Sequence, residues 1–394
     1  MQHFDSVRTV ARELRPFAPQ HVFRPSAITH AVTHFQQHFA AKVMYAVKTN
    51  PESYVLDALH AQGINRFDVA SIDEVRLIRS RFPDAELFFM HTVKSRQAIA
   101  EAYHEHGVRA FSLDTHEELH KIMAETGNAK DLRLFVRMAI PNSYSEISLA
   151  DKFGATSADA VELLKATRPF AHQLGVCFHV GSQCMHPDAY RIAIRMAYQV
   201  IRTADVKVEA LDVGGGFPSI YPGMMPPPLT DFFSAIEEEF AKGPDHANME
   251  LYAEPGRALV AESGSVLVRV ELRKQDYLYI NDGTYGSLFD AGTPQFIFPT
   301  SLMRDAHSAN VMPYSFFGPT CDTLDFMKGP FYLADDIVEG DYIEIGQLGA
   351  YSRAMMTSFN GFGPTQHVVA VDGPPLMSVY QGNQTDQDMR LMAA

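Results

Sequence analysis

The regular alternation of short apolar runs with amphipathic stretches is the feature that most limits how this chain can fold. The apolar runs are bounded by Gly, Asn or Asp, and the stretches between them have helical periodicity. Strands that alternate with helices of this length form βαβ units around a parallel sheet. The predicted strands are 43–47, 66–69, 86–90, 108–112, 132–136, 175–180, 208–213 and 249–253, and the predicted helices include 72–80, 94–106, 115–126, 158–166, 188–202 and 229–240.

These strands predict an α/β fold, a closed TIM-like (β/α)8 barrel over residues 22–255. An open doubly wound sheet is the alternative, and it is disfavoured because no GxGxxG follows the first strand. After residue 256 helical periodicity is scarce, which predicts a C-terminal all-β domain of sandwich or barrel-like form. It would comprise 256–394 together with the arm 1–21, and its predicted strands are 266–272, 277–281, 295–298, 330–333, 341–345 and 367–371.

Charge and cysteine content limit the classes of function. The chain has 394 residues and a net charge of −14. This charge argues against nucleic acid as a partner and favours a cationic substrate, although a generally acidic surface explains the total more simply. Three cysteines without a CxxC pair predict reduced thiols and no bound metal. No apolar run is long enough to cross a membrane and the first 14 residues lack a secretory signal, so we expect a cytoplasmic protein without membrane contact.

Several polar residues fall at the predicted ends of barrel strands, where such barrels place their chemistry. Lys48 follows the first strand, and burial there is expected to lower its pKa and favour the neutral amine that forms a Schiff base. The ordinary structural explanation is a lysine that extends its amine into solvent. The other candidates at strand ends are Asp68, His91, Arg137, His179, the glycines after Asp212, and Glu254.

Two turn motifs predict groups that could bind a phosphorylated ring. Three glycines, Gly214–Gly216, allow backbone amides to approach an anion closely, although a tight turn would need them equally. In Glu254-Pro-Gly-Arg257 the carboxylate could face a pyridine nitrogen and the guanidinium could hold a phosphate. A local Glu–Arg ion pair is the simpler alternative.

Further candidates lie at His179 and at Cys321. The imidazole of His179 could stack on a flat ring, and Ser182 could add a hydroxyl to a phosphate, although a histidine in such a place is more often a core residue. Cys321 and Asp322 share a Gly-Pro turn far from the barrel in sequence. A thiol beside a carboxylate suggests a proton donor next to an acid that binds ammonium. A cysteine protease nucleophile is the alternative, and no histidine spacing supports it.

Taken in order, these motifs carry a resemblance to a known family. Lys48, the His-Val-Gly-Ser segment, the triple glycine, Glu-Pro-Gly-Arg and Gly-Pro-Thr-Cys-Asp resemble those of fold-type III pyridoxal-phosphate decarboxylases, and within them the ornithine/lysine decarboxylases. The resemblance runs from about Val22 to Gly363, nearly the whole chain.

The resemblance implies pyridoxal 5'-phosphate as the cofactor and a role for each matching residue. Lys48 would bind the cofactor as a Schiff base, His179 would stack on its ring, and Glu254 would pair with the pyridine nitrogen. The remaining cofactor-binding residues would be Asp68, Arg137, Ser182, Gly215, Gly216, Gly256, Arg257 and Tyr351, with Glu74 at a nearby acidic position.

The resemblance also implies a homodimer whose active sites lie at the interface. Cys321 and Asp322 would reach the site of the partner subunit, where Cys321 would protonate the α-carbon after CO2 leaves. Lys152 and Asp325 match a pair that bridges the interface, and Tyr285 matches an interface aromatic. Each active site would thus be completed by the bound cofactor and by residues of the partner subunit.

The substrate implied is a small cationic amino acid, L-ornithine with some activity on L-lysine. Asp322 and Asp290 would bind the distal ammonium, beside Tyr285. The segment 286–290 is shorter than is usual in the family and has Phe in place of Tyr, so Asp290 is assigned by its nearness to the motif. Ornithine and lysine differ by one methylene, which a pocket separates by only about 1–3 kcal/mol.

Three alternatives share parts of the pattern. A diaminopimelate decarboxylase has the same barrel, but it must bind a distal carboxylate and usually has Glu where this chain has Asp322. Alanine racemase pairs the pyridine nitrogen with arginine, which Glu254 argues against. A non-catalytic regulatory homologue would typically lose the lysine, the cofactor contacts or the cysteine, and all are present here.

Overall fold

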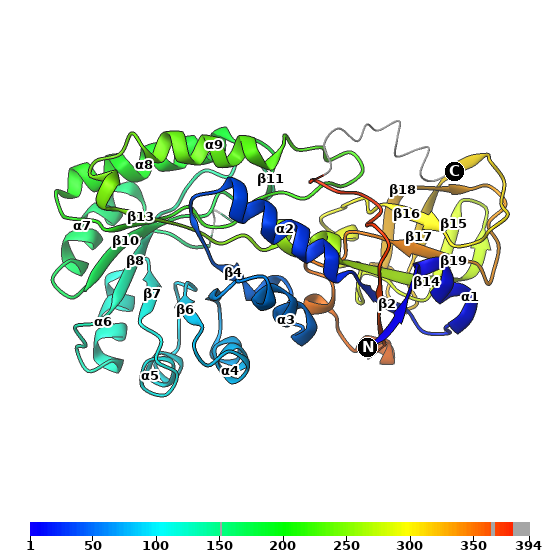
Figure 1. Cartoon of the computed structure of the whole chain (residues 1–394), viewed down its shortest axis with the longest axis horizontal. Helices are drawn as coiled ribbons and strands as arrows, with labels where there is room; N and C mark the ends of the chain where they lie inside the picture. Colours follow the sequence, from blue (N-terminus) through cyan, green and yellow to red (C-terminus); the bar gives the residue numbers. More distant parts are fainter. Residues whose placement is uncertain (150–151, 364–366, 381–394) are drawn as a thin grey trace.

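Two large sheets organise the molecule. The computed structural model describes residues 1–149, 152–363 and 367–380. One sheet is parallel and lies with its helices in the left lobe of Figure 1, and the other is mixed and lies in the right lobe. Among the described residues, no helix is both long and apolar enough to cross a membrane.

The parallel sheet closes on itself. Its first segment is split into β3 (Lys42–Val43) and β4 (Tyr45–Ala46); β3 pairs with the last strand and β4 with the second, so this one segment joins both edges. The predicted (β/α)8 barrel is therefore confirmed. The other strands are β5 (Arg66–Val69), β6 (Glu86–Phe89), β7 (Ala110–Leu113), β8 (Arg133–Arg137), β10 (Gln173–Cys177), β12 (Ala210–Asp212) and β13 (Glu250–Ala253), all parallel to their neighbours.

Helices surround the barrel, and several begin where the sequence offers a hydroxyl cap. Ser71, Ser95, Thr115 and Thr156 each accept a hydrogen bond from a backbone amide in the first turn of the following helix, which satisfies a donor that the helix leaves free. The helices are α2 (Pro25–His38), α3 (Ser53–Ala61), α4 (Ile72–Arg81), α5 (Arg96–His104), α6 (His116–Glu125), α7 (Ser157–Thr167), α8 (Asp188–Ala204) and α9 (Leu229–Phe240).

The barrel has an inner and an outer apolar layer. The interior is filled by large side chains from successive strands, including Phe88, Phe135 and Tyr252, all at most 1% exposed. The outer layer lies between the strands and the surrounding helices. A barrel filled in this way is a solid core, so function is left to the loops at its rim. One such loop pair forms a small sheet of β9 (Ser145–Ile147) and β11 (Ser182–Cys184).

The mixed sheet is built around the long strand β14 (Gly264–Lys274). It pairs with β2 (Gln20–Phe23) from the N-terminal arm, with β19 (Tyr342–Ile345) and with β15 (Tyr277–Ile280). A buried ion pair between Arg24 and Glu344 links the arm to this sheet. The other strands are β1 (Gln2–Phe4), β16 (Thr300–Leu302), β17 (Val311–Phe317), β18 (Phe326–Ala334) and β20 (Val368–Val371), and α1 (Val7–Leu14) packs beside them.

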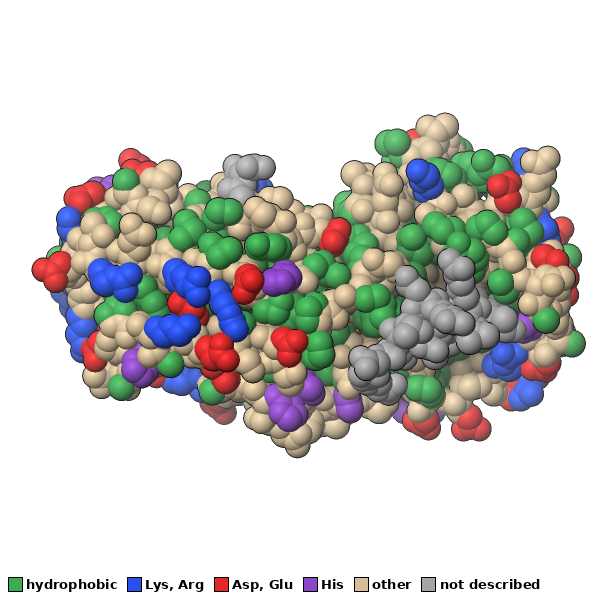
Figure 2. All heavy atoms as spheres, turned by 90° about the horizontal axis from the view of Figure 1, so that it is seen from above, with side chains coloured by type: hydrophobic (Ala, Val, Ile, Leu, Met, Phe, Trp, Pro, Cys, Tyr) green, Lys and Arg blue, Asp and Glu red, His purple; other side chains and the backbone are tan. Residues whose placement is uncertain are grey.

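Short helical turns connect these elements. They are η1 (Val47–Thr49), η2 (His246–Asn248), α10 (Arg257–Val260), η3 (Ala261–Ser263), η4 (Phe289–Ala291), η5 (Arg353–Met355) and η6 (Phe359–Gly361). Seen from above, the outline of the molecule is notched between the two lobes, and hydrophobic side chains are exposed along the middle of that face (Figure 2).

Two predicted strands need correction, and one observed strand was missed. The first barrel strand ends at Ala46, and Val47 already belongs to the turn η1. Residues 295–298 form no strand, because Phe296 and Phe298 are buried against the ring of Tyr221 from a loop. Residues 311–317 form β17, which was not expected. The division of the chain into domains at residues 22 and 255 stays a prediction.

Candidate active site

Lys48 lies at the mouth of the barrel, in the turn η1 that follows β4. Its Nζ is 3.0 Å from Oδ2 of Asp68, the third residue of the neighbouring strand β5, and its side chain is 42% exposed. Burial lowers the pKa of Lys48, but the carboxylates of Asp68 and Glu254 outweigh burial and raise that pKa above its usual value. The expected lowering of this pKa was therefore wrong, because the sequence could not show that two acids face the amine.

Two further carboxylates lie behind Lys48. Asp212 ends β12, Glu254 follows β13, and both are buried and hydrogen-bonded to each other. Burial, together with the charges of Asp212 and Asp68, holds the pKa of Glu254 well above its usual range. Burial also raises the pKa of Asp212 to about 6. Two buried carboxyls in contact cannot both ionise at low cost, so this pair retains a proton near neutral pH.

His179 is held as a neutral imidazole between basic residues. Its Nδ1 accepts a hydrogen bond from the amide of Gly181 at 3.0 Å, which leaves the proton on Nε2. Burial lowers the pKa of His179 well below its usual value, and the charges of Arg137 and Lys48 add to this. Arg137 ends β8 on the same rim. The structure thus gathers four predicted residues, Lys48, Asp68, Arg137 and His179, around one opening.

Arg257 begins α10 and is the centre of a second group. One Nη donates to the hydroxyl of Tyr221 at 2.8 Å, and the other lies 3.1 Å from Asp290 and 3.4 Å from the hydroxyl of Ser182. Its Cζ is 4.9 Å from the ring centre of Tyr351. Arg257, Asp290 and Tyr221 are all at most 5% exposed.

The glycines on this rim leave no space for side chains. A Cβ on Gly215 would lie 2.7 Å from the carbonyl of Glu254 and 3.0 Å from Nε2 of His179. Gly216 has φ +99°, and a Cβ there would lie 2.5 Å from the carbonyl of Gly181. Gly256 is equally confined, since its Cβ would meet Thr49 at 2.1 Å. Close backbone approach therefore requires glycine at all three positions.

Tyr351 is placed by a strained turn. It has φ +51°, a conformation that side-chain-bearing residues adopt rarely, and its amide donates to the carbonyl of Thr49 at 3.0 Å. Because Thr49 is the neighbour of Lys48, this bond fixes the loop of the mixed sheet to the lysine turn. Tyr351 consequently lies beside Arg257, and its contact with the phosphate stays a prediction.

Cys321 and Asp322 lie elsewhere, in the loop between β17 and β18. Cys321 is exposed, and its amide donates to the side chain of Asn360 at 3.0 Å. Asp322 accepts hydrogen bonds from the amide of Leu324 at 3.0 Å and from the hydroxyl of Tyr285 at 2.6 Å, and these two bonds lower its pKa. Among the described residues, no hydrogen bond or ion pair joins this loop to Lys48.

The expected interface pair of Lys152 and Asp325 is not favoured by the geometry. Asp325 is 1% exposed, and its two oxygens accept hydrogen bonds from the amides and hydroxyls of Thr284 and Thr320. The carboxylate that was expected to face another chain instead holds together the turn that carries Cys321 and Asp322. The family motif could not reveal that these two threonines donate the hydrogen bonds that the Asp325 carboxylate accepts.

Two comparisons of sequence decide the family. The sequence profile described as "Pyridoxal-dependent decarboxylase, pyridoxal binding domain" matches residues 26–261, more than half of the chain. The chain belongs to the pyridoxal-dependent decarboxylase family. Among the curated relatives of this chain, ornithine decarboxylase of Caenorhabditis elegans is 31% identical over 81% of this chain and 79% of the relative. Lysine/ornithine decarboxylase of Selenomonas ruminantium is 29% identical over 88% and 87%.

Relatives with other names match similarly well. Antizyme inhibitor 2 of Xenopus laevis is 30% identical over 82% of this chain and 74% of the relative. Among solved structures, a lysine/ornithine decarboxylase from Vibrio vulnificus complexed with cadaverine aligns with a TM-score of 0.79 at 25% identity, covering 95% of this chain and all of that chain. These neighbours share the barrel and the second sheet of this family member.

The cofactor of the family is pyridoxal phosphate, and the residues of this chain fit it. Among the described residues, the amides of Gly215 and Gly216 donate no hydrogen bond, and the Nε of Arg257 is buried without a partner. Backbone amides and a guanidinium are suitable ligands for a phosphate. At the other end, among the described residues, a buried oxygen of Asp68 lacks a hydrogen-bond partner, and the Asp68 charge acts on Glu254. An acidic group there suits a ring nitrogen that must stay protonated.

Two residues of the site were not foreseen as functional. Asp212 was noted only as the end of a strand, although an acid between Leu211 and Val213 in a buried strand was a detectable signal. Tyr221 begins a Pro-rich stretch, and nothing in the neighbouring sequence indicated that its hydroxyl would bond to Arg257. Glu74 was expected only at a nearby acidic position. Its carboxylate accepts a hydrogen bond from the amide of Ala70 at 2.6 Å, and burial raises its pKa to about 7.

Proposed function

We propose that this chain decarboxylates L-ornithine to putrescine, and L-lysine to cadaverine more slowly. The observation that carries the proposal is the lysine at the barrel mouth, which faces Asp68 at 3.0 Å, with the phosphate-suited group around Arg257 on the same rim. Two of the named curated relatives are decarboxylases of ornithine or lysine, which supports the same substrate class.

The cofactor, when bound, supplies the electron-accepting ring that a decarboxylation requires. The proposed tasks of the protein are to hold and orient this ring. Lys48 is the amine that attaches it, and Asp68 holds the Nζ of Lys48 at 3.0 Å. His179 presents a flat neutral imidazole to the ring face. Glu254 and Asp212 hold a proton at the position proposed for the ring nitrogen.

The second part of the proposal concerns the substrate and the last proton. Asp322 stays ionised because Leu324 and Tyr285 donate to it, so it can bind a distal ammonium. Cys321 is the proposed donor to the α-carbon after CO2 leaves. Since Cys321 lies on an exposed loop, we propose that it acts in the site of a second copy, in a homodimer with shared active sites.

Asp290 remains part of the proposal, but as a secondary contact to the substrate ammonium. It is the nearest acid in sequence to the shortened segment, and its carboxylate is bound to Arg257 at 3.1 Å. To reach an ammonium as well, Asp290 must use its other oxygen. We therefore assign the main ammonium contact to Asp322 and an accessory contact to Asp290.

The test is a CO2-release assay with ornithine, lysine, arginine and diaminopimelate, each with added pyridoxal phosphate. The expected order is ornithine first and lysine second, with little release from the other two. Release from diaminopimelate alone would overturn the proposal. A protein that binds the cofactor to no detectable extent and releases no CO2 would instead be a non-catalytic homologue, as the match to antizyme inhibitor 2 allows.

A further inference from the structure

A groove rich in arginine lies in the right lobe, between α1 and the ends of β14, β16 and β19. Its volume is about 500 Å3, within the range of small-ligand sites. Five of its twelve lining residues are arginines and two are aspartates, although the chain as a whole has a net charge of −14. We call this the arginine groove. Its arginines are Arg8, Arg12, Arg15, Arg269 and Arg304, and its acids are Asp305 and Asp341.

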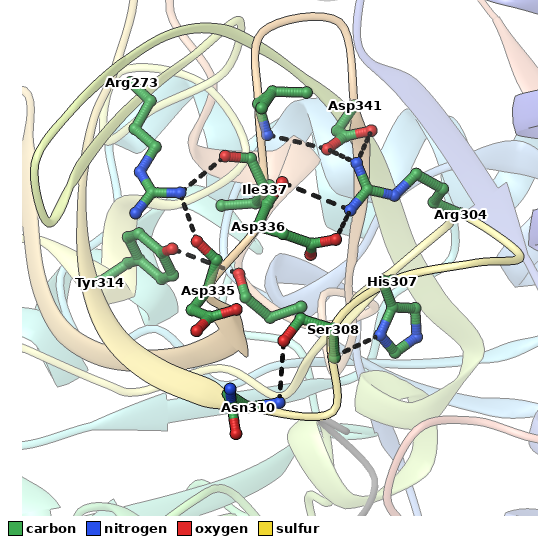
Figure 3. A network of polar contacts seen from close by, with 12 residues as sticks. Arg273, Arg304, His307, Ser308, Asn310, Tyr314, Asp335, Asp336, Ile337 and Asp341 are labelled. Atoms are coloured by element: carbon green, nitrogen blue, oxygen red, sulfur yellow. Dashed lines mark hydrogen bonds and ion pairs between the residues drawn. The ribbon is translucent and has the colours of Figure 1, made fainter.

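The floor of the groove is fixed by Arg304. Its two Nη atoms bind Asp341 at 2.9 Å and Asp336 at 2.7 Å, and Figure 3 shows it held between these two carboxylates. Asp341 also accepts from the amide of Val338 at 2.9 Å. One of the two acids of the groove is thereby occupied and cannot neutralise the arginines of α1.

The wall of the groove is one face of α1. Arg8 and Arg12 are four residues apart and so share this face, and Arg15 follows the last residue of the helix in a left-handed conformation with φ +44°. Arg8 donates to the carbonyl of Arg304 at 2.6 Å and lies 3.3 Å from Asp305, the second acid. The helix is therefore anchored by Arg8, and both acids of the groove have partners.

Two guanidinium groups remain largely uncompensated. The side chain of Arg12 is 66% exposed, and within the described part of the chain its single ion pair is with its neighbour Glu13, at 3.6 Å. Arg15 is exposed, and among the described residues it forms no ion pair. Burial raises the pKa of Tyr342, and the nearby charges of Arg269 and Arg15 oppose this increase. Arg269 on β14 is already paired with Glu271 at 3.0 Å, so the positive charge left for a ligand comes mainly from Arg12 and Arg15.

An exposed aromatic ring stands beside these charges. Phe17 is 84% exposed and lines the groove, and its ring centre is 5.8 Å from the Cζ of Arg269. An exposed phenylalanine over a basic groove offers a surface on which a flat ring can stack. The groove therefore has two different ligand-binding features, a set of charges and a ring.

We propose that the arginine groove binds an anion with a chain of phosphoryl groups. Planar guanidiniums bind phosphate oxygens in pairs, and several of them spaced along a helix suit an extended chain better than a single carboxylate. Inorganic triphosphate and a nucleoside triphosphate share this chemistry. Only the second has a base that can stack on Phe17, so a variant of Phe17 separates the two sources.

The experiment uses the full chain saturated with pyridoxal phosphate, so that the phosphate-suited residues around Arg257 are already occupied. Titration calorimetry at about 0.15 M salt, where exposed charges are partly screened, is run with sodium triphosphate, with ATP and with orthophosphate. We expect triphosphate and ATP to bind and orthophosphate to bind much more weakly. In the double variant R12A/R15A the Kd for triphosphate should rise at least about tenfold.

The controls separate this effect from general charge loss. The double variant R202A/K207A removes two exposed positive charges at the end of α8, and it should bind triphosphate as the unaltered chain does. Phe17→Ala should weaken ATP alone if the ligand is a nucleotide, and neither probe if it is inorganic. Arg15→Gln, a milder change, should weaken binding with an unchanged melting temperature. Equal Kd values for R12A/R15A and the unaltered chain, or no binding of either phosphate chain, would overturn the proposal.

Discussion

The barrel mouth and the loop between β17 and β18 carry the two parts of the candidate site, and they are built in opposite ways. At the barrel mouth the acids are buried, bonded to one another and fixed at strand ends, as with Asp212 and Glu254. In the loop, Cys321 is exposed and Asp322 is fixed by only two hydrogen bonds. The barrel therefore forms a rigid cofactor site within one chain, whereas the loop presents its residues outward, where another chain can receive them.

The largest effect is expected from Lys48→Ala. This change removes the amine while the carboxylates of Asp68 and Glu254 remain, so the cofactor loses its attachment. Activity should fall on the order of 10³-fold or more. Loss of the visible absorbance of the bound cofactor is the second measurement. Lys165→Ala, a change of an exposed lysine on α7, is the control for the barrel. Retention of full activity in Lys48→Ala would contradict the assignment.

Cys321→Ala should have the next largest effect. A positioned proton donor contributes on the order of 10²-fold or more, so kcat should fall by about that factor while cofactor absorbance is unchanged. Cys184→Ala is the matched control, because Cys184 is buried and its thiol only donates to the carbonyl of His186. A Cys321→Ala enzyme with an unchanged kcat would remove the loop from the chemistry.

A smaller effect, in KM, is expected from Tyr285→Phe. The hydroxyl of Tyr285, after the amide of Leu324, keeps the pKa of Asp322 below its usual value, so the carboxylate stays charged as the pH falls. Without the hydroxyl this pKa rises, and Asp322 gains its proton at a higher pH. KM for ornithine should therefore increase by a few fold, mainly on the acid side of the pH profile. An identical acid limb in both enzymes would exclude this role for Tyr285.

The two regions also differ in how far the sequence predicted them. Strand β5 and helix α9 have the predicted bounds, because an apolar run and a helical periodicity are both clear in those stretches of the sequence. The barrel residues followed from their places at strand ends. Residues 295–298 were mistaken for a strand because apolar side chains that pack from a loop have the same composition as a buried strand.

What the sequence could not provide was the set of contacts between distant segments. The raised pKa of Lys48 depends on acids 20 and 206 positions away along the chain, and only the fold brings them together. The same holds for Asp290, whose bond to Arg257 spans 33 positions. For Asp325, the four hydrogen bonds from Thr284 and Thr320 replaced an interface role that the motif alone suggested.

The most direct test of the account is to combine Lys48→Ala and Cys321→Ala in one preparation. Each variant alone should be nearly inactive. If the barrel of one chain uses the loop of another, co-expressed chains should form hybrid dimers with one intact site, and activity should return to about one quarter of the unaltered level for random pairing. No recovery in hybrid dimers, or full activity in a preparation shown to be monomeric, would contradict the shared site.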